Sequence, residues 1–312
     1  MPIKHNYTAT GANDGTKQVS VDRWNEAHAV DSEGLTIPVH ASLPTTPANG
    51  SVIAFSRSLA GREMLAYLDS DGFDAPMQTL FGRSKPTYWF PQNNSTTLTF
   101  NGAATLSATG TATAATVATT GLYASVNKVE YLVTTAATTA VAGYRAANAQ
   151  FWRGNAAGLG GFFHLARVSP ATGVTTATRR FFCGMASSTA APTDVQPSSQ
   201  TNVIGVGYDA ADTNWQVIVN GTGTATKYDT GIARPSADRT ALVEVIIHAP
   251  VNGSSVTVQF IDLASGASYS VTETTNLPSS TTLLAPRAYA SVGGTSSVIG
   301  LALASLYIES DL

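Results

Sequence analysis

The chain has 312 residues, of which 43% are hydrophobic and 12% are charged, and its formal net charge is −3. This apolar content is enough for a sizeable core and excludes a chain that is disordered throughout. The charge balance leaves no basic field that could neutralise phosphates, which argues against a nucleic-acid partner. Because Thr, Ser, Ala and Gly take the place of charged residues, we expect a nearly neutral, hydroxyl-rich surface.

The first residues contain no apolar segment typical of a signal peptide. The longest apolar run, 301–308, has about eight residues, whereas a membrane helix needs roughly 20. We therefore expect synthesis in a cytoplasm and no membrane insertion.

Residues 1–40 are predicted to form a loop-rich leader with one short helix at 20–29. Asp22 can cap this helix, and Trp24 and His28 share one of its faces at positions i and i+4. A helix of about two turns is too short to be stable alone. Its Trp24–His28 face must therefore dock, either onto another protein as an attachment segment or back onto its own chain.

Residues 41–85 are predicted to form a small β module with strands at 51–55, 64–68 and 77–81. The segment Asp69–Gly72 has the composition of a tight turn between the last two strands. Its two carboxylates stand in a calcium-like order, but the distal glutamate of a calcium loop is missing, so we expect a hairpin turn and no metal site.

Residues 86–312 have the pattern of a β-sandwich. The Ala/Thr-rich stretch 102–121 fits extended, paired strands, and strand patterns recur from 129–133 onward at sandwich spacing. In 256–260, apolar and polar residues alternate, which gives each strand one core face and one solvent face. The apolar phase changes between Leu303 and Leu306, which predicts a bulge near Ser305.

No catalytic constellation is recognisable, and we expect no catalytic residue and no cofactor. The glycines of 205–210 have dinucleotide-loop spacing, but a turn and a strand follow instead of the required helix. The five histidines are scattered singly. We expect His164 to be a sheet residue with satisfied hydrogen bonds and Cys183 to be a buried, inert thiol.

Acidic residues are sparse, and a pair that cleaves glycosides is not apparent. Glu130, Glu244 and Glu273 lie at strand positions where we expect them on a solvated outer face.

The loop after residue 207 is the best candidate ligand site. It carries Tyr208, Asp209, Asp212 and Asn214, and such side chains can bind sugar hydroxyls and stack on a pyranose ring. The alternative is an ordinary hairpin turn. We expect alanine at the two aspartates and the asparagine to leave stability nearly unchanged.

Several segments resemble tail-fibre and related appendage proteins of tailed bacteriophages. The leader motif 22–28 is similar to their particle-attachment segments, and further similar segments cover most of the chain. These segments are 61–66, 90–97, 146–151, 158–163, 182–193, 211–214 and 305–309. The resemblance implies a virion protein with a lectin-like jelly-roll sandwich on a short attachment region, commonly trimeric and without catalytic residues.

The sequence thus predicts a mainly β, non-enzymatic virion appendage, such as a tail fibre or receptor-binding protein. Its N-terminus would join other virion proteins, and its sandwich, repeated in a homotrimer, would bind host surface polysaccharide with avidity. One rival is a capsid or tail decoration protein that stabilises the virion. A weaker rival is a polysaccharide depolymerase.

Overall fold

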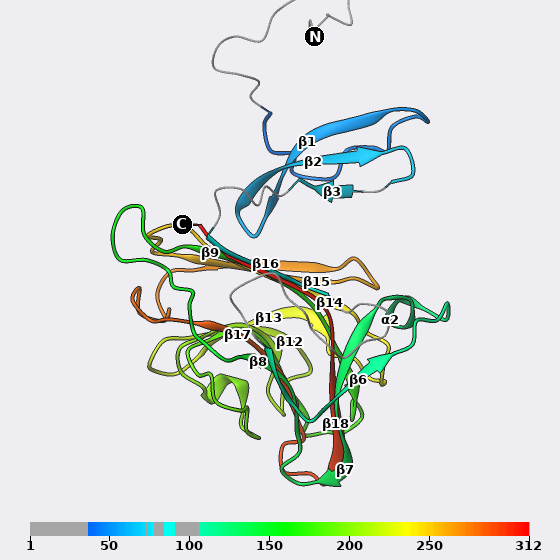
Figure 1. The fold of residues 1–312 in the computed structure, drawn as a ribbon, viewed down its shortest axis with the longest axis vertical. Coiled ribbons are helices and arrows are strands. Elements are labelled where there is room, and N and C mark those ends of the chain that lie inside the picture. Colours follow the sequence, from blue (N-terminus) through cyan, green and yellow to red (C-terminus); the bar gives the residue numbers. More distant parts are fainter. Residues whose placement is uncertain (1–36, 73, 78–83, 91–105, 312) are drawn as a thin grey trace, which may run out of the picture. The chain divides into compact units, whose positions relative to one another are not determined.

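The computed structural model describes residues 37–72, 74–77, 84–90 and 106–311 (Figure 1). The predicted helix with Trp24 and His28 lies outside these residues. The described chain divides into two compact units. One holds most of strands β1 to β3, and the other holds β4 to β18.

The first unit is a three-stranded antiparallel sheet in the order β1-β2-β3. Its strands are β1 (Val52–Leu59), β2 (Arg62–Asp69) and β3 (Asp74–Pro76). The predicted first two strands are confirmed. The turn between β2 and β3 is also confirmed, with the Asp71 amide donating to Asp69 Oδ1 at 3.0 Å. The predicted third strand at 77–81 lies, apart from Met77, outside the described residues. The third strand of the described sheet, β3, ends before Met77.

The second unit is a β-sandwich of two antiparallel sheets, which confirms the predicted fold class. The seven-stranded sheet has the order β13-β12-β11-β10-β17-β8-β5. Its strands are β5 (Leu106–Thr109), β8 (Val141–Ala146), β10 (Arg180–Ala186), β11 (Val203–Tyr208), β12 (Asn214–Asn220), β13 (Thr226–Ala233) and β17 (Ala285–Ser291). A 3-10 turn, η1 (Pro197–Ser199), precedes β11.

The eight-stranded sheet has the order β16-β15-β14-β9-β18-β7-β6, and β4 pairs with β18. Its strands are β4 (Ser84–Trp89), β6 (Thr111–Ala115), β7 (Lys128–Ala137), β9 (Phe162–Thr172), β14 (Val243–Ala249), β15 (Val256–Asp262), β16 (Ser268–Glu273) and β18 (Ser297–Ser310). A single helical turn, α2 (Leu122–Ser125), lies between β6 and β7.

The core lies between the two sheets and follows the alternation of each strand. On β15, Val256, Val258 and Phe260 are fully buried, whereas Thr257 and Gln259 between them are half-buried. Trp215 on β12 is also a core residue, as the alternation predicts. Burying one such aliphatic or aromatic side chain contributes roughly 1.5–3 kcal/mol, so this shared interior holds the sheets together.

The phase change in β18 is a true bulge. Its register against β9 shifts between Leu303 and Ser305, so the extra residue returns Leu306 to the core face already occupied by Leu303. The predicted bulge is confirmed. On the side away from β9, β18 pairs first with β7 and then with β4.

The Ala/Thr-rich stretch forms two strands, as predicted, but they join opposite sheets. β5 pairs with β8 and β6 pairs with β7. Gly110 connects them with φ +80°, and a Cβ there would lie 2.8 Å from the carbonyl oxygen of Leu132. Only glycine fits this combination of left-handed backbone and close approach.

Candidate functional site

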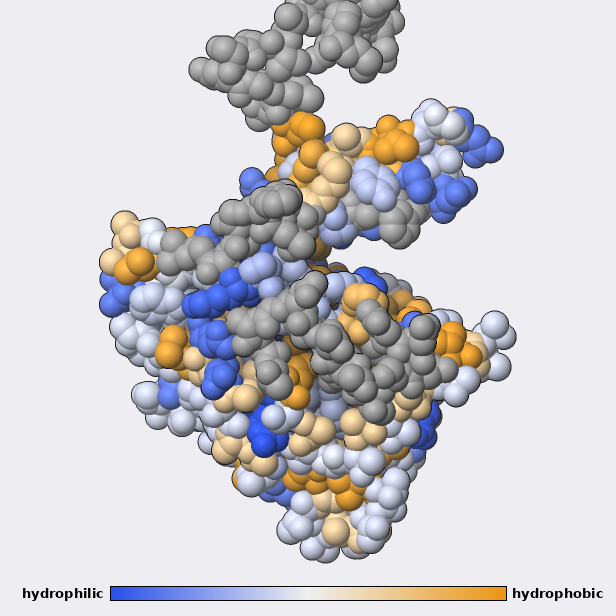
Figure 2. Space-filling view, viewed as in Figure 1, coloured by the Kyte–Doolittle hydropathy of each residue, from blue (hydrophilic) through white to orange (hydrophobic). Residues whose placement is uncertain are grey.

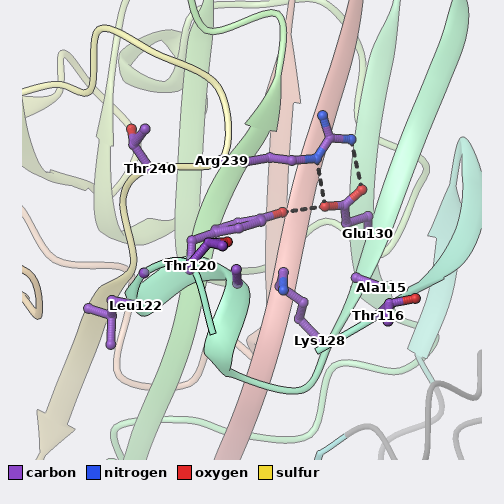
Figure 3. Close-up of a pocket in the computed structure, with 11 residues that line it drawn as sticks. Ala115, Thr116, Thr120, Leu122, Lys128, Glu130, Arg239 and Thr240 are labelled. Atoms are coloured by element: carbon purple, nitrogen blue, oxygen red, sulfur yellow. Dashed lines mark hydrogen bonds and ion pairs between the residues drawn. The ribbon is translucent and has the colours of Figure 1, made fainter. Parts of the chain in front are cut away.

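A pocket of about 590 Å³ with both polar and apolar lining lies in the sandwich unit where β6 passes through α2 into β7 (Figure 3). Its lining is Ala115, Thr116, Thr120, Gly121, Leu122, Tyr123, Ala124, Lys128, Glu130, Arg239 and Thr240. This volume falls in the ordinary range of about 300–1,000 Å³ for small-molecule sites. We therefore treat the pocket as the candidate functional site.

The strand alternation of β7 aims the charged residues into this pocket. Val129 and Tyr131 belong to the core between the sheets, so Lys128 and Glu130 point to the opposite, outer face. Residues 116–127 return over that face because Ala115 on β6 pairs with Lys128 on β7. Both charged side chains are therefore covered, with exposed fractions of 2% and 6%.

The single turn α2 places Tyr123 above Glu130. The Tyr123 ring packs against Ala171 and Ala302 on the outer face of the sheet. Its hydroxyl donates a hydrogen bond to Glu130 Oε1. Burial, and next the bond to Glu130, raise the pKa of Tyr123 well above its usual value, so this hydroxyl keeps its proton.

Arg239 reaches Glu130 from the connection between β13 and β14. Its Nε donates to Oε1 at 3.0 Å and its Nη2 donates to Oε2 at 2.9 Å, a two-pronged pair that fixes the carboxylate (Figure 3). Burial alone would raise the pKa of Glu130, but the hydrogen bonds from Arg239 and Tyr123 outweigh it and lower that pKa. Glu130 is therefore an ionised acceptor.

Arg239 adopts a strained backbone, with φ +56° in the left-handed region. For a residue other than glycine this conformation costs on the order of 1 kcal/mol or more and persists only when its surroundings hold it. The pair with Glu130 provides such a restraint. Arg239 itself remains exposed at the pocket, as does the neighbouring Thr240.

The pocket lining offers hydrogen-bond donors and acceptors to a ligand. Among its lining residues there is no histidine, cysteine or serine, and Glu130 is the one acid. Glycoside cleavage uses two carboxyl groups, one of them protonated. Because Glu130 stands alone and ionised, its side chain can accept and orient hydrogen bonds but cannot serve as a general acid.

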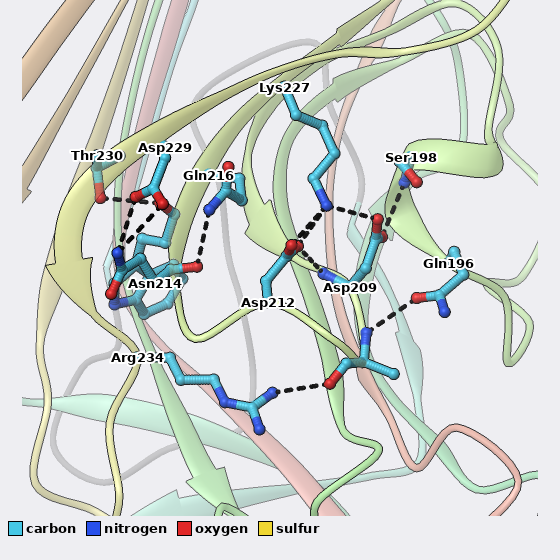
Figure 4. A network of polar contacts seen from close by, with 12 residues as sticks. Gln196, Ser198, Asp209, Asp212, Asn214, Gln216, Lys227, Asp229, Thr230 and Arg234 are labelled. Atoms are coloured by element: carbon cyan, nitrogen blue, oxygen red, sulfur yellow. Dashed lines mark hydrogen bonds and ion pairs between the residues drawn. The ribbon is translucent and has the colours of Figure 1, made fainter.

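The predicted ligand loop has a different role in the structure (Figure 4). Asp209 and Asp212 flank the turn between β11 and β12, and both hold Lys227 of β13. Lys227 Nζ lies 2.9 Å from Asp209 Oδ2 and 2.5 Å from Asp212 Oδ2. Asp209 Oδ1 also accepts the amide of Ser198 at 3.1 Å. These carboxylates form a clamp across strands.

The other two residues of that loop are also engaged. Asn214 Nδ2 donates to both carboxylate oxygens of Asp229, at 2.9 and 3.2 Å. Tyr208 is fully buried and packs edge-on against Trp215, with 5.1 Å between ring centroids. The prediction that Tyr208 stacks on a sugar is therefore wrong. The clamp also contradicts the expectation that alanine here would leave stability nearly unchanged.

The three glutamates expected on a solvated face are all buried. Glu244 pairs with Arg167 at 2.7 Å, and Glu273 accepts hydrogen bonds from Tyr228 and Thr275. Glu130 is covered by residues 116–127 and by the connection between β13 and β14 that carries Arg239. The expectation is wrong because partners such as Arg167, Tyr228 and Arg239 lie far from these glutamates in sequence.

Of the two predictions about buried side chains, the one for Cys183 is confirmed and the one for His164 is partly wrong. Cys183 is fully buried, and burial raises the pKa of its thiol to about 12, as expected for an inert residue. His164 is a buried sheet residue, but neither of its ring nitrogens has a hydrogen-bond partner among the described residues. The prediction of a satisfied histidine is therefore wrong.

Neither a metal site nor a membrane helix is found within the described ranges. No group of three or more His, Cys, Asp or Glu side chains in that part of the chain is arranged to hold a metal ion. No described helix is both long and apolar enough to cross a bilayer.

The chain is similar to several solved lectin structures. A lectin from Bauhinia forficata in complex with GalNAc gives a TM-score of 0.43 at 10% identity, covering 73% of this chain and 98% of the lectin. Peanut lectin gives 0.42 at 13% identity, covering 66% and 90%. A carbohydrate esterase from a Shiga toxin-encoding bacteriophage gives 0.39 at 13% identity, covering 65% and 89%.

At these TM-scores and identities, the likeness assigns neither a ligand nor a role. No protein-family model matches the sequence, and no curated protein is recognisably similar to it. The class of the molecule is a two-sheet antiparallel β-sandwich with a small three-stranded sheet.

Proposed function

We propose that the chain is a non-enzymatic bacteriophage virion appendage, a tail fibre or receptor-binding protein, whose sandwich binds glycan on the host surface. Residues 1–40, including Trp24 and His28, attach it to other virion proteins. A homotrimer multiplies the weak affinity of a single pocket into avidity.

The observation that carries this proposal is the pocket beside α2. It combines fixed charged groups with the hydroxyls of Thr116, Thr120 and Thr240 at its rim. Sugars present hydroxyl groups that pair with such donors and acceptors, while the exposed Leu122 offers apolar contact. The sandwich surface in Figure 2 mixes white and pale-blue areas with tan and orange patches, so it offers both polar and apolar contacts.

The resemblance of the sequence to phage appendage proteins supports the virion role. Deleting residues 1–40 tests it: the truncated chain should stay folded and should no longer join particles. Incorporation at normal copy number would contradict the attachment role.

Glycan binding is tested with fluorescently labelled protein on an array of purified bacterial surface polysaccharides. Thr116→Trp should block the pocket and reduce binding at least tenfold, since lost contacts of about 1.4 kcal/mol account for that factor. Thr222→Trp makes the same change at an exposed threonine outside the pocket lining and should bind like the parent.

The array also separates the rival functions. Absence of binding to every polysaccharide would favour a capsid or tail decoration protein. Release of reducing ends from a bound polysaccharide would favour the depolymerase. Parent-like binding by the folded Thr116→Trp variant would show that the pocket is not the site.

A further inference from the structure

We infer that the pocket beside α2 selects a sugar residue bearing a single negative charge, with Lys128 as the residue that recognises it. This inference rests on the proposed glycan binding and specifies the class of glycan. Its basis is the charge and the hydrogen-bonding state of the groups at the base of the pocket.

The pocket is positive within an acidic protein. Two cations, Lys128 and Arg239, face one carboxylate, Glu130, among the lining residues. Asp238 lies beside Arg239, but it is not part of the lining and accepts hydrogen bonds from the Val174 amide and the Thr172 hydroxyl. The whole chain carries a net charge of −3. The lining residues alone therefore carry one excess positive charge. The pKa of Arg239 is raised first by its hydrogen bonds to Glu130 and also by the nearby charge of Asp238, so Asp238 offsets part of the charge of Arg239.

The two cations are not equivalent. Arg239 already forms a salt bridge with Glu130 through two hydrogen bonds. Lys128 forms no ion pair among the described residues: its ammonium donates one bond to the carbonyl of Val126 at 3.2 Å and lies 4.4 Å from the centre of the Tyr123 ring. An ammonium has three donors. At least one donor of Lys128 thus remains for a ligand.

The burial of Lys128 makes this free donor unusual. At 2% exposure, water cannot solvate the ammonium as it does a surface lysine, and its charge is penalised. Desolvation accordingly lowers its pKa. An anionic group in the pocket would compensate the charge directly, and the pair would be screened less than one on the surface.

The ligand's single charge follows from the one excess cation among the lining residues. A carboxylate, as in an acidic sugar, and a phosphodiester each supply one negative charge. The rim hydroxyls of Thr116, Thr120 and Thr240 would then contact neutral hydroxyl groups of the same sugar. A neutral sugar would leave the buried Lys128 with only the charge of Glu130, which Arg239 already shares.

The test uses the full-length chain and compares colominic acid, dextran and any polysaccharide that binds on the array. Each bound polysaccharide is assayed again after its carboxyl groups are reduced to alcohols, and after its phosphodiesters are cleaved with hydrofluoric acid. We expect binding to acidic polymers only, and a loss of tenfold or more when the responsible anion is removed. The treatment that abolishes binding identifies that anion.

Lys128→Met retains the length and the apolar stem of the side chain and removes its charge. We expect it to bind the acidic polysaccharide about tenfold to a hundredfold more weakly, the usual factor for a hydrogen bond to a charged group. Lys85→Gln also removes one charge, at an exposed lysine outside the pocket lining, and should bind like the parent. Melting temperatures show that both variants fold.

The inference is overturned if Lys128→Met, folded, binds the acidic polysaccharide as tightly as the parent, or if the anion-free polysaccharides bind equally well. In both cases glycan binding itself survives. If no polysaccharide binds the parent chain, the proposed function fails together with the inference.

Discussion

The buried imidazole of His164 should make the sandwich sensitive to mild acid. The side chain is fully buried on β9, and burial lowers its pKa from about 6.5 to about 3. In the unfolded chain it accepts a proton once the pH falls below about 6.5, whereas the folded protein keeps it neutral down to about 3. Its contribution to stability is thus complete above pH 6.5 and lost as the pH falls toward 3.

The size of this effect follows from the two pKa values. At pH 5 the unfolded state gains about 2 kcal/mol from protonating this residue, and the total loss approaches roughly 5 kcal/mol near pH 3. The free energy of unfolding of a domain is about 5–15 kcal/mol, so the protonation of this one histidine in the unfolded state removes a large share of it.

The variant His164→Leu removes the titrating group and the unsatisfied ring nitrogens. We expect it to be about as stable as the parent or more stable at pH 7.5, because an unsatisfied buried polar group costs about 1–3 kcal/mol. Urea unfolding followed by tryptophan fluorescence should give a free energy of unfolding that falls about 2 kcal/mol less than the parent's between pH 7.5 and pH 5.

His40→Leu makes the same change at an exposed histidine and serves as the control. If His164→Leu and the parent lose stability in parallel over this pH range, His164 is not neutral in the fold and the reasoning fails.

Four further predictions concern stability and assembly. Lys227→Met should lower the free energy of unfolding by about 2 kcal/mol, because two half-buried or buried carboxylates lose their cation; an unchanged urea midpoint would contradict the clamp. Four hydrogen bonds outweigh burial and lower the pKa of Glu273 to about 2, so its carboxylate stabilises the fold above about pH 4.5 and this contribution is lost as the pH falls to 2. Glu273→Gln has no such contribution, so its free energy of unfolding should fall less than the parent's over this pH range in an acid titration followed by circular dichroism. Gly110→Ala should destabilise by about 1–3 kcal/mol in thermal unfolding, since φ is positive and the Leu132 carbonyl is close. Light scattering of the full-length chain should give the mass of a trimer, and a monomer at micromolar concentration would exclude it.

Strand periodicity predicted most of the sandwich, including the bulge in β18. It worked because each of these strands has one face in the core, so burial fixes which residues are apolar. It did not predict β3 at Asp74–Pro76, and the strand that it predicted at 77–81 lies mostly outside the described residues. The tight turn after Asp69 sets the register there and pairs Leu68 with Asp74 directly.

The candidate site was missed because its parts meet only in the folded chain. Lys128 and Glu130 are close in sequence, but Arg239 is 109 residues from Glu130. Alternation on β7 could have shown that both residues point away from the core. It could not show that residues 116–127 and 234–242 would cover them, because that depends on how connections pack over a sheet.

The loop at 208–214 was misjudged for a related reason. Asp209 and Asp212 looked like free turn residues because their partner, Lys227, comes from the next strand of the sheet. For Tyr208 a local signal did exist: Val206 and Ile204, two and four residues earlier on β11, share its core face.

The most direct test of the account is a crystal structure of the chain with an oligosaccharide from a polysaccharide that it binds. We predict electron density for a sugar beside α2, with an anionic group within hydrogen-bonding distance of Lys128 Nζ and hydroxyl groups against the rim threonines. Density at another surface, such as the turn at Asp209–Asn214, with an empty pocket beside α2, would contradict it.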